Sequence, residues 1–334
     1  MTPEFKAVAP TSLVAAKGKH LVCGAGGSRA ILASAGAVMA TRFAGITEWQ
    51  TIGGISGGSI PAVALAAGID PRELMQLTVD VDFSSLVPRH ATPLSTVLAF
   101  ILKDRFEYTR PKKGVLGSEN LGKFIDSLVP VWPKGFWTMA VVARTQIVFT
   151  EHGVFQYLRN GQRRVLSTVP APVGIAIRAT CAIPGIIDAV EWNNRLLHDG
   201  ALSWDGVCPV GVPQRHFNAK PEDIIGCDVG DEASRWQQFT HFFWTLLCGG
   251  HCVEPKGPKT PIHPKITMIN AKVWSVRSLQ FTPTAEQKWQ AVHSGFQEAV
   301  TQLSNAGHLT GGKLQEALAI CADLNKLKAL SAAR

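Results

Sequence analysis

The chain has 334 residues, of which 46% are hydrophobic and 17% charged, and its formal net charge at pH 7 is +8. Intrinsic disorder is excluded, because disordered chains are poor in apolar residues. The 31 glycines and 20 prolines are ordinary for a globular protein and exclude collagen-like and low-complexity classes. A basic chain favours anionic partners: nucleic acid, an acidic lipid surface or a phosphorylated substrate. Charge alone does not choose among them.

The seven cysteines are odd in number, and most lie among apolar neighbours. They indicate buried thiols in a reducing compartment rather than a disulfide framework. Residues 1–19 lack the continuous apolar stretch of a secretory signal, and no run reaches the roughly 18 apolar residues of a membrane span. We therefore expect a cytoplasmic protein without a transmembrane segment that can associate peripherally with a membrane.

A strand, a glycine-rich loop, a helix and a second strand are expected after a loose leader at residues 1–17. The run Lys19–Gly24 is apolar and ends in glycine, which is typical of a buried strand. Arg29–Phe43 has the small-residue composition of a buried helix, and Glu48–Ile55 is the second strand. A helix over Gly57–Ala67 follows. This alternation predicts a parallel sheet with helices on its faces.

The rest of the chain mixes helices with strands in one α/β domain, residues 18–310, followed by a C-terminal helix at 311–334 that packs on it. Asp70 before Pro71 is typical of a helix N-terminus. Further helices are predicted at Leu94–Leu102, Glu119–Leu128, Val173–Cys181, Gln287–Leu303 and Leu314–Leu330. Strands are predicted at Met139–Phe149, Val154–Leu158, Ile186–Leu197, Ile224–Val229 and Ile266–Ala271, with turns at Glu151–Gly153 and Asn193–Asn194.

A serine stands between glycines at the predicted junction of the second strand and its helix, in the sequence Gly54-Ile55-Ser56-Gly57-Gly58. A G-x-S-x-G sequence in this context predicts a nucleophile elbow, because the tight turn strains the serine backbone and the glycines clear space around it. The helix N-terminus then stabilises developing negative charge. The alternative is a glycine-rich turn that only packs the helix against the strand.

A second glycine-rich segment, Gly24–Ala30, ends the first predicted strand. Clustered glycines let backbone N–H groups converge on one point, and Arg29 and the helix start add positive potential. Such a loop suits a phosphate or the oxyanion of acyl transfer. A dinucleotide site would need G-x-G-x-x-G, but Arg29 takes the place of the last glycine. A structural turn is the other alternative.

Together with two later motifs, these segments resemble the patatin-like phospholipases. Ala179–Gly185 is similar to the family's A-[ST]-x-A-x-P stretch, and Asp199-Gly200-Ala201 to its D-G-[GA] motif. The chain departs from the family's loop at Ala25 and Ala30, where the pattern has glycines. The resemblance spans roughly Lys19 to Val210. It implies a three-layer α/β/α fold with a central, mainly parallel sheet.

The resemblance also implies a lipid acyl hydrolase, a serine esterase of the phospholipase A type that cleaves phospholipid or lysophospholipid esters. The family's dyad maps onto Ser56 as nucleophile and Asp199 as general base, a role that needs burial to raise the aspartate pKa. The oxyanion hole maps onto Gly26, Gly27, Ser28 and Arg29. The implied partner is a lipid at a membrane or micelle surface, and the mechanism requires no cofactor and no metal.

Several alternatives stay open. The enzyme could hydrolyse neutral lipids or small esters, and the two loop alanines could mark a catalytically weak lipid-binding or signalling module. A Ser–Asp–His triad is the rival mechanism, because many histidines follow Asp199 as in α/β-hydrolases. The candidates are His216, His241, His251, His263, His293 and His308. Nucleic-acid binding is not expected, since no known motif accompanies the basic runs.

Three further patterns have ordinary explanations and functional alternatives. Cys248–Cys252 has zinc-like spacing but lacks a second ligand pair, so free thiols are expected. The aromatic stretch 236–247 and the loop Gly249–Pro264 could form a core helix and its connection, or a lid that docks on lipid. The basic runs at 103–113 and 159–164 are typical of a solvated surface, or could contact phosphate head groups.

Overall fold

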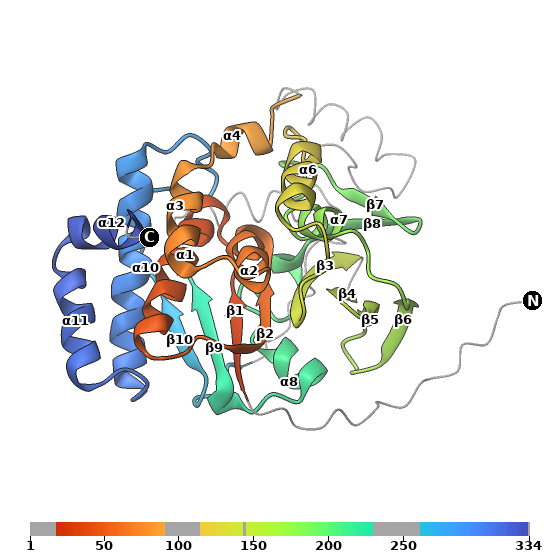
Figure 1. Cartoon of the computed structure of the whole chain (residues 1–334). Helices are drawn as coiled ribbons and strands as arrows, with labels where there is room; N and C mark the ends of the chain where they lie inside the picture. The colour runs from red at the N-terminus through yellow and green to blue at the C-terminus, as the bar shows by residue number, and fades with distance from the viewer. Residues whose placement is uncertain (1–17, 91–113, 143–144, 230–260, 333–334) are drawn as a thin grey trace, which may run out of the picture.

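Figure 1 shows the computed structural model, a central sheet with helices on its faces; it describes residues 18–90, 114–142, 145–229 and 261–332. The strands are β1 (Lys19–Cys23), β2 (Trp49–Gly54), β3 (Phe136–Val142), β4 (Thr145–Thr150), β5 (Gly153–Tyr157), β6 (Arg163–Ser167), β7 (Val190–Trp192), β8 (Arg195–Asp199), β9 (Ile224–Asp228) and β10 (Thr267–Asn270). The helices are α1 (Gly27–Phe43), α2 (Ser59–Ala66), α3 (Pro71–Asp80), α4 (Phe83–Leu86), α6 (Glu119–Leu128), α7 (Val173–Thr180), α8 (Gly211–Phe217), α10 (Ala285–Asn305), α11 (Gly311–Cys321) and α12 (Leu324–Ala332).

The sheet is parallel in its central part, where the strand order is β10-β9-β1-β2-β3. Beyond β3 it continues antiparallel through β4, β5 and β6. One edge of β3 is shared: Gly54 at the end of β2 pairs with Thr138, and Asp199 at the end of β8 pairs with Ala140. The ends of β2 and β8 therefore meet on β3.

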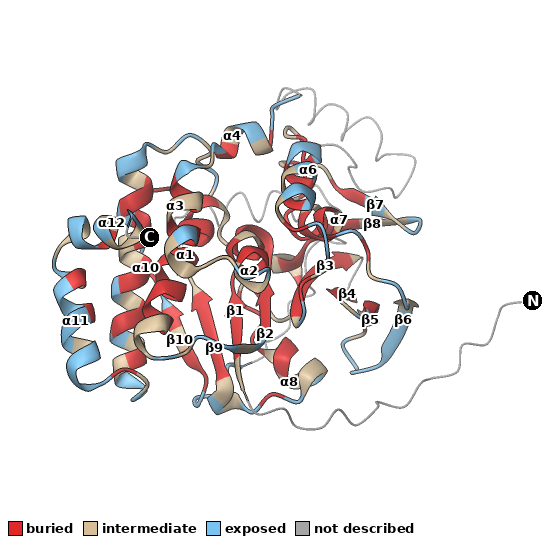
Figure 2. Ribbon diagram, viewed as in Figure 1, coloured by how far each residue is buried: buried red, intermediate tan, exposed pale blue. Residues whose placement is uncertain are grey.

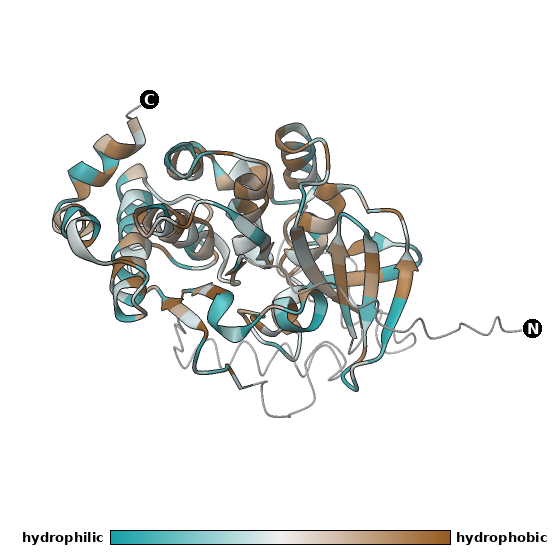
Figure 3. Cartoon of the chain, turned by 60° about the horizontal axis from the view of Figure 1, so that its bottom comes forward, coloured by the Kyte–Doolittle hydropathy of each residue, from teal (hydrophilic) through white to brown (hydrophobic). Residues whose placement is uncertain are grey.

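The two faces of the parallel strands build two separate parts of the core. In β1, Leu21 and Cys23 belong to the core cluster formed with α1, α3 and α10, whereas Val22 belongs to the cluster that includes Val212 of α8. This alternation is the period of two that a strand imposes. Figure 2 shows the central parallel strands mostly buried, with the helix faces that pack on them, and in Figure 3 hydrophobic residues gather on the same elements. The expected three-layer α/β/α architecture with a mostly parallel central sheet is confirmed.

Helix α1, which follows the glycine-rich loop, is buried along most of its length and packs closely on α10. A Cβ atom on Gly36 would lie 1.9 Å from the carbonyl oxygen of Val292, and one on Gly295 would lie 2.0 Å from that of Ala33. Glycine is therefore required on both sides of this crossing. The tight contact fixes α1, and with it the loop at its N-terminus.

Several predicted elements are confirmed. Asp70 caps α3 by accepting the N–H of Arg72 at 2.9 Å, with Pro71 at the first helical position. The turn at Asn193–Asn194 joins β7 to β8, and both asparagines have positive φ, 46° and 58°. Two left-handed residues are what a tight hairpin of type I′ needs, and Asn tolerates that conformation. The predicted helix Leu94–Leu102 lies outside the described residues.

Other predictions were wrong in detail. The run Met139–Phe149 is not one strand. It contains parts of β3 and β4, which pair antiparallel as a hairpin. Two helices, α11 and α12, replace the single helix expected over Leu314–Leu330. They separate where the Asp323 carboxylate accepts the N–H of Asn325 at 2.9 Å, which satisfies a backbone donor of the second helix. Strand β6 and helix α8 were not predicted. In the described part of the chain, no helix has the length and apolar character needed to cross a membrane.

Candidate active site

Ser56 lies directly after β2 in a tight turn and has a φ of 50°. This left-handed conformation is costly for a residue with a side chain, so the surrounding structure must hold it. The neighbouring glycines permit the turn: a Cβ on Gly57 would lie 2.2 Å from the Gly27 carbonyl oxygen, and one on Gly58 would lie 2.2 Å from that of Gly24. The turn thus packs directly against the glycine-rich loop, and Ser56 is only 4% exposed.

Two hydroxyl groups hold the backbone of Ser56. Thr180, at the end of α7, accepts the Ser56 N–H at 3.1 Å, and its own hydroxyl donates to the Met139 carbonyl at 2.5 Å. Ser59 donates from its hydroxyl to the Ser56 carbonyl at 2.6 Å. All of these groups are buried, so each bond satisfies a polar atom that has no access to water. Thr180 ties the turn to β3.

Asp199 ends β8 and lies beside Ser56, 3% exposed. Its carboxylate accepts the N–H of Ala201 at 2.8 Å, and the Ser56 side chain lies close enough to influence its pKa. Burial raises the pKa of Asp199 to about 7, whereas the Ala201 N–H and the nearby Ser56 side chain lower it. Gly200 is required here, because a Cβ would lie 2.2 Å from the Met139 carbonyl oxygen. The structure therefore brings the two predicted dyad residues together.

The glycine-rich loop passes over the Ser56 turn, with Gly26 and Gly27 at φ values of 150° and 56°. Ser28 donates its N–H to the Ser278 carbonyl at 3.0 Å and its hydroxyl to the Gln280 carbonyl at 2.8 Å. The buried guanidinium of Arg29 donates to the Val229 carbonyl at 2.7 Å. Within the described residues, by contrast, the N–H groups of Gly26 and Gly27 donate to no protein acceptor.

The two alanines that depart from the family's loop pattern are both buried. Ala25 is part of the core on one face of the sheet, and Ala30 is part of the core on the other. The Ala25 N–H donates to the Val207 carbonyl at 2.7 Å, which holds the start of the loop. Each methyl group therefore fits into packed core, and the loop is formed with alanine at both places.

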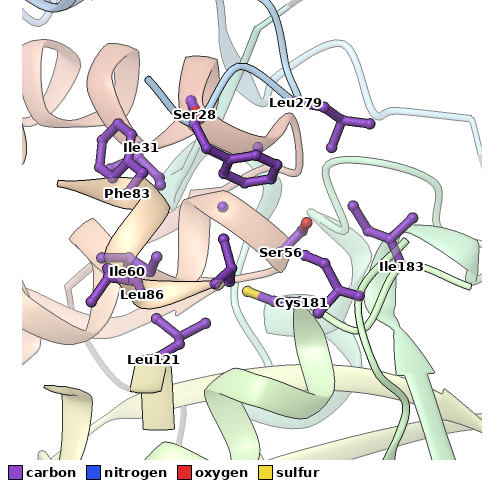
Figure 4. Close-up of a pocket in the computed structure, with 15 residues that line it drawn as sticks. Ser28, Ile31, Ser56, Ile60, Phe83, Leu86, Leu121, Cys181, Ile183 and Leu279 are labelled. Carbon is purple, nitrogen blue, oxygen red and sulfur yellow. The ribbon is translucent and has the colours of Figure 1, made fainter. Parts of the chain in front are cut away.

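An apolar pocket of about 50 Å³ opens beside Ser56 (Figure 4). In Figure 4 the Ser56 hydroxyl and the Cys181 thiol lie at the pocket, with aliphatic side chains around them. The lining comes from α1, α2, α4, α6 and the loops after α7 and β10. It consists of Gly27, Ser28, Ile31, Ser56, Gly57, Ile60, Phe83, Leu86, Val87, Leu121, Cys181, Ile183, Ile187, Leu279 and Phe281. The lining is almost entirely apolar, so the pocket suits an apolar ligand group.

The described histidines among the triad candidates interact with other groups. His216 is hydrogen-bonded to the Tyr157 hydroxyl at 2.7 Å, and burial, followed by nearby Arg163 and Arg215, lowers its pKa. The remaining contacts are His293 with the Ile320 carbonyl, His308 with Thr267, and His263 with the Lys265 N–H. His241 and His251 lie outside the described residues.

The remaining sequence patterns lie mostly outside the described residues, including the stretch 236–247, the Cys248–Cys252 pattern and the basic run at 103–113. Among the residues that the structure describes, no group of three or more potential metal ligands occurs. The basic run at 159–164 ends in β6, where Arg163 and Arg164 are exposed on the edge strand. The Arg163 guanidinium lies over the Phe155 ring, 4.1 Å from its centroid.

Sequence reasoning missed two parts of the site. Thr180 lies inside the quoted Ala179–Gly185 motif, but nothing in the motif indicated its bond to Ser56. Residues 278–280, which accept both hydrogen bonds from Ser28, carry no recognisable signal. They reach the loop only through the tertiary fold.

The parallel sheet, the strained serine after β2 and the buried carboxylate beside it define an α/β protein with a nucleophile-elbow architecture. A profile of the family described as patatin-like phospholipase matches residues 21–208, which is more than half of the chain. The chain therefore belongs to the patatin-like phospholipase family, a family of lipid acyl hydrolases, and the resemblance seen in the sequence is confirmed.

Among solved structures, the chain is similar to the crystal structure of VipD from Legionella pneumophila. The TM-score is 0.47 with 13% sequence identity, and the match covers 87% of this chain and 67% of the VipD chain. No curated protein matches the sequence at a significant level.

Proposed function

We propose that the protein hydrolyses carboxylic esters of phospholipids or lysophospholipids through an acyl-Ser56 intermediate, with Asp199 as the general base. The observation that carries the proposal is the position of the Ser56 side chain beside the buried carboxylate of Asp199, whose pKa is raised to about 7 by burial. A base with a pKa near neutrality accepts the serine proton far better than an ordinary aspartate does. The apolar pocket beside this pair supports an acyl group as the part of the substrate that is bound.

In the first half of the reaction, the Ser56 oxygen attacks the ester carbonyl carbon while its proton passes to Asp199. The carbonyl oxygen becomes an oxyanion, and the C–O bond to the leaving alcohol then breaks as Asp199 returns the proton to that alcohol. The product is an ester between Ser56 and the fatty acyl group. In the second half, water attacks this ester while Asp199 accepts a proton from the water. The bond between the acyl carbon and the Ser56 oxygen then breaks, Asp199 returns the proton to that oxygen, and the fatty acid leaves.

The oxyanion is assigned to the N–H groups of Gly26 and Gly27. This assignment is supported by their position over the Ser56 turn and by the absence of a protein acceptor for either donor within the described ranges. Ser28 and Arg29 belong to the loop in a supporting role, because Ser28 uses its donors on residues 278–280 and Arg29 donates to Val229. Preorganised N–H donors of this kind are each worth about 10²–10³ in rate.

Defined lipids provide the test. The purified protein is incubated with a phosphatidylcholine, a lysophosphatidylcholine, a triacylglycerol and a soluble short-chain ester, and the released fatty acids are measured by mass spectrometry. We expect fatty-acid release from the two phospholipids that is lost in Ser56→Ala and retained in Ser127→Ala, an exposed serine on α6. A fluorophosphonate should label the wild type at Ser56.

Each alternative has its own outcome in this experiment. Release from the triacylglycerol or the soluble ester alone would make the protein a neutral-lipid or small-ester hydrolase. No serine-dependent release from any substrate would favour a lipid-binding module. Release that persists in Ser56→Ala would remove Ser56 as the nucleophile.

A further inference from the structure

The segment 272–281 joins β10 to α10 and alternates between buried and exposed side chains. Val273 and Val276 are buried, whereas Lys272, Trp274 and Arg277 are exposed. Trp274 is 80% exposed and Leu279 is 44% exposed. Among the residues that the structure describes, Trp274 is the most exposed large apolar side chain.

The exposure of Trp274 does not come from a loosely held backbone. The Ser275 hydroxyl donates to the Gln287 carbonyl at 2.9 Å, which ties the segment to the first turn of α10. Inside the segment, the Arg277 N–H donates to the Gln280 side chain and the Gln280 N–H to the Arg277 carbonyl, at 3.2 and 3.1 Å. The fold therefore presents the indole at the surface on a fixed support.

The same segment borders the pocket beside Ser56. Leu279 and Phe281 line the pocket that contains Ser56, and in the view of Figure 4 Leu279 and Leu121 stand on opposite sides of it. The carbonyls of Ser278 and Gln280 accept the two hydrogen bonds of Ser28. Leu279 is therefore both exposed at the surface and part of the pocket lining.

The charged side chains of the segment itself are all cationic. Lys272 and Arg277 are exposed on the same segment as Trp274, and the sequence contains no Asp or Glu from residue 261 to residue 285. Exposed indole and leucine side chains beside cations suit the boundary between lipid head groups and acyl chains, where Trp is preferred and Lys or Arg contacts phosphate.

We propose that the 272–281 segment is a docking surface for a bilayer that contains anionic phospholipid. Trp274 and Leu279 enter the interfacial region, and Lys272 and Arg277 contact lipid phosphates. The pocket then faces the bilayer along the Leu279 side, so that an acyl chain reaches Ser56 without crossing water. This last step rests on the proposed function, whereas the docking itself does not.

The test uses the full-length protein and compares two double variants. Trp274→Ser with Lys272→Glu removes one apolar and one cationic group from the surface. The matched control, Val131→Ser with Lys134→Glu, removes an exposed apolar residue and an exposed cation just before β3. That site lies at the end of the sheet opposite to Ser56. Binding is measured by flotation with vesicles of phosphatidylcholine and phosphatidylglycerol, and with vesicles of phosphatidylcholine alone.

We expect the Trp274/Lys272 variant to lose vesicle affinity by at least about tenfold and the control to match the wild type. Wild-type binding should weaken without the anionic lipid and at high salt. Hydrolysis of a soluble short-chain ester should be unchanged in both variants, which reports an intact fold and site. The wild type and both variants could all lack ester turnover and still differ in flotation. That result would support the docking surface and contradict the proposed function.

Equal vesicle binding by the wild type and the Trp274/Lys272 variant would overturn the inference, and so would an equal loss in the control. A third result also overturns it: the wild type does not float but sediments as a dimer, and the Trp274/Lys272 variant sediments as a monomer. The surface would then be an interface between two copies of the chain.

Discussion

Ser56 and Asp199 lie next to each other because the ends of β2 and β8 meet on the same edge of β3. Gly54, two residues before the serine, pairs with Thr138, and Asp199 pairs with Ala140 further along that strand. The register of the sheet therefore sets the separation between hydroxyl and carboxylate. A pair held by strands needs little reorganisation before it reacts, which is the condition for efficient proton transfer.

The first prediction concerns the pH dependence of activity. Asp199 accepts a proton in the proposed mechanism, so only its ionised form is active. Because burial raises the pKa of Asp199 to about 7, kcat/KM should rise with pH through about 7 and level off above it. The measurement is a pH profile with a soluble short-chain ester. A rate that stays constant between pH 5 and pH 8 would contradict the general-base role.

The second prediction concerns stability. The folded protein holds a proton on Asp199 up to a pH of about 7, whereas an unfolded chain releases it near 3.8. The free energy of unfolding therefore falls as the pH rises from 3.8 to 7 and stays lowered above that window. Asp199→Asn has no carboxyl group to ionise at this position, so its free energy of unfolding does not fall in this way as the pH rises. Relative to wild type, the variant should gain nothing at pH 3 and up to about 4 kcal/mol at pH 8, measured by denaturant unfolding. An equal difference at both pH values would contradict the prediction.

The third prediction concerns the contact between the elbow and the glycine-rich loop. In Gly57→Ala, the new Cβ would lie 2.2 Å from the Gly27 carbonyl oxygen, so the two backbones must move apart. Since Gly27 is a proposed oxyanion donor, we expect turnover to fall by roughly 10²–10³-fold. Gly312→Ala is the control, because a Cβ there meets nothing within 4 Å. Equal activity of the two variants would exclude the proposed role of this contact.

The motifs of the site were predictable because each is a local pattern tied to a local structure. Gly54–Gly58 forms its turn from five consecutive residues, and the predicted proximity of Ser56 and Asp199 came from the family resemblance. The β3–β4 break was not predictable in this way, because the sequence between Val142 and Thr145 lacks the Asn or Gly that usually marks a two-residue turn.

Elements defined by distant partners also escaped prediction. The run Arg163–Ser167 reads as a charged surface segment, and it is a strand only because β5 pairs with it. As an edge strand it keeps its arginines exposed, which hides the alternation of a half-buried strand. The Ser28–Gln280 bond links residues that are 252 positions apart. Neither feature has a counterpart in a short stretch of sequence.

The fourth prediction concerns acyl-chain length. Leu86 lines the pocket from α4 and is only partly buried, so a larger side chain fits there with little disturbance of the core. Leu86→Trp should reduce the space for an acyl chain and lower kcat/KM for long-chain esters at least about tenfold more than for short-chain esters. Leu86→Met preserves the volume and should keep the wild-type preference. An unchanged chain-length profile in Leu86→Trp would place the acyl chain elsewhere.

The last prediction concerns Thr180, which positions the nucleophile without touching the substrate. Its hydroxyl accepts the Ser56 N–H and donates to the Met139 carbonyl. Thr180→Val keeps the shape but leaves both buried groups unsatisfied, which should lower the free energy of unfolding by about 1–3 kcal/mol.

In Thr180→Val, the Ser56 backbone also loses one of the hydrogen bonds that hold its positive φ. We therefore expect kcat for a soluble ester to fall while KM changes little. Thr180→Ser retains the hydroxyl and should restore kcat, which a merely space-filling role of the side chain does not predict. Unfolding curves and steady-state kinetics on the two variants separate the effects. If Thr180→Val lost stability but kept the wild-type kcat, Thr180 would support the fold alone, and the elbow would hold its geometry through Ser59 and the neighbouring glycines.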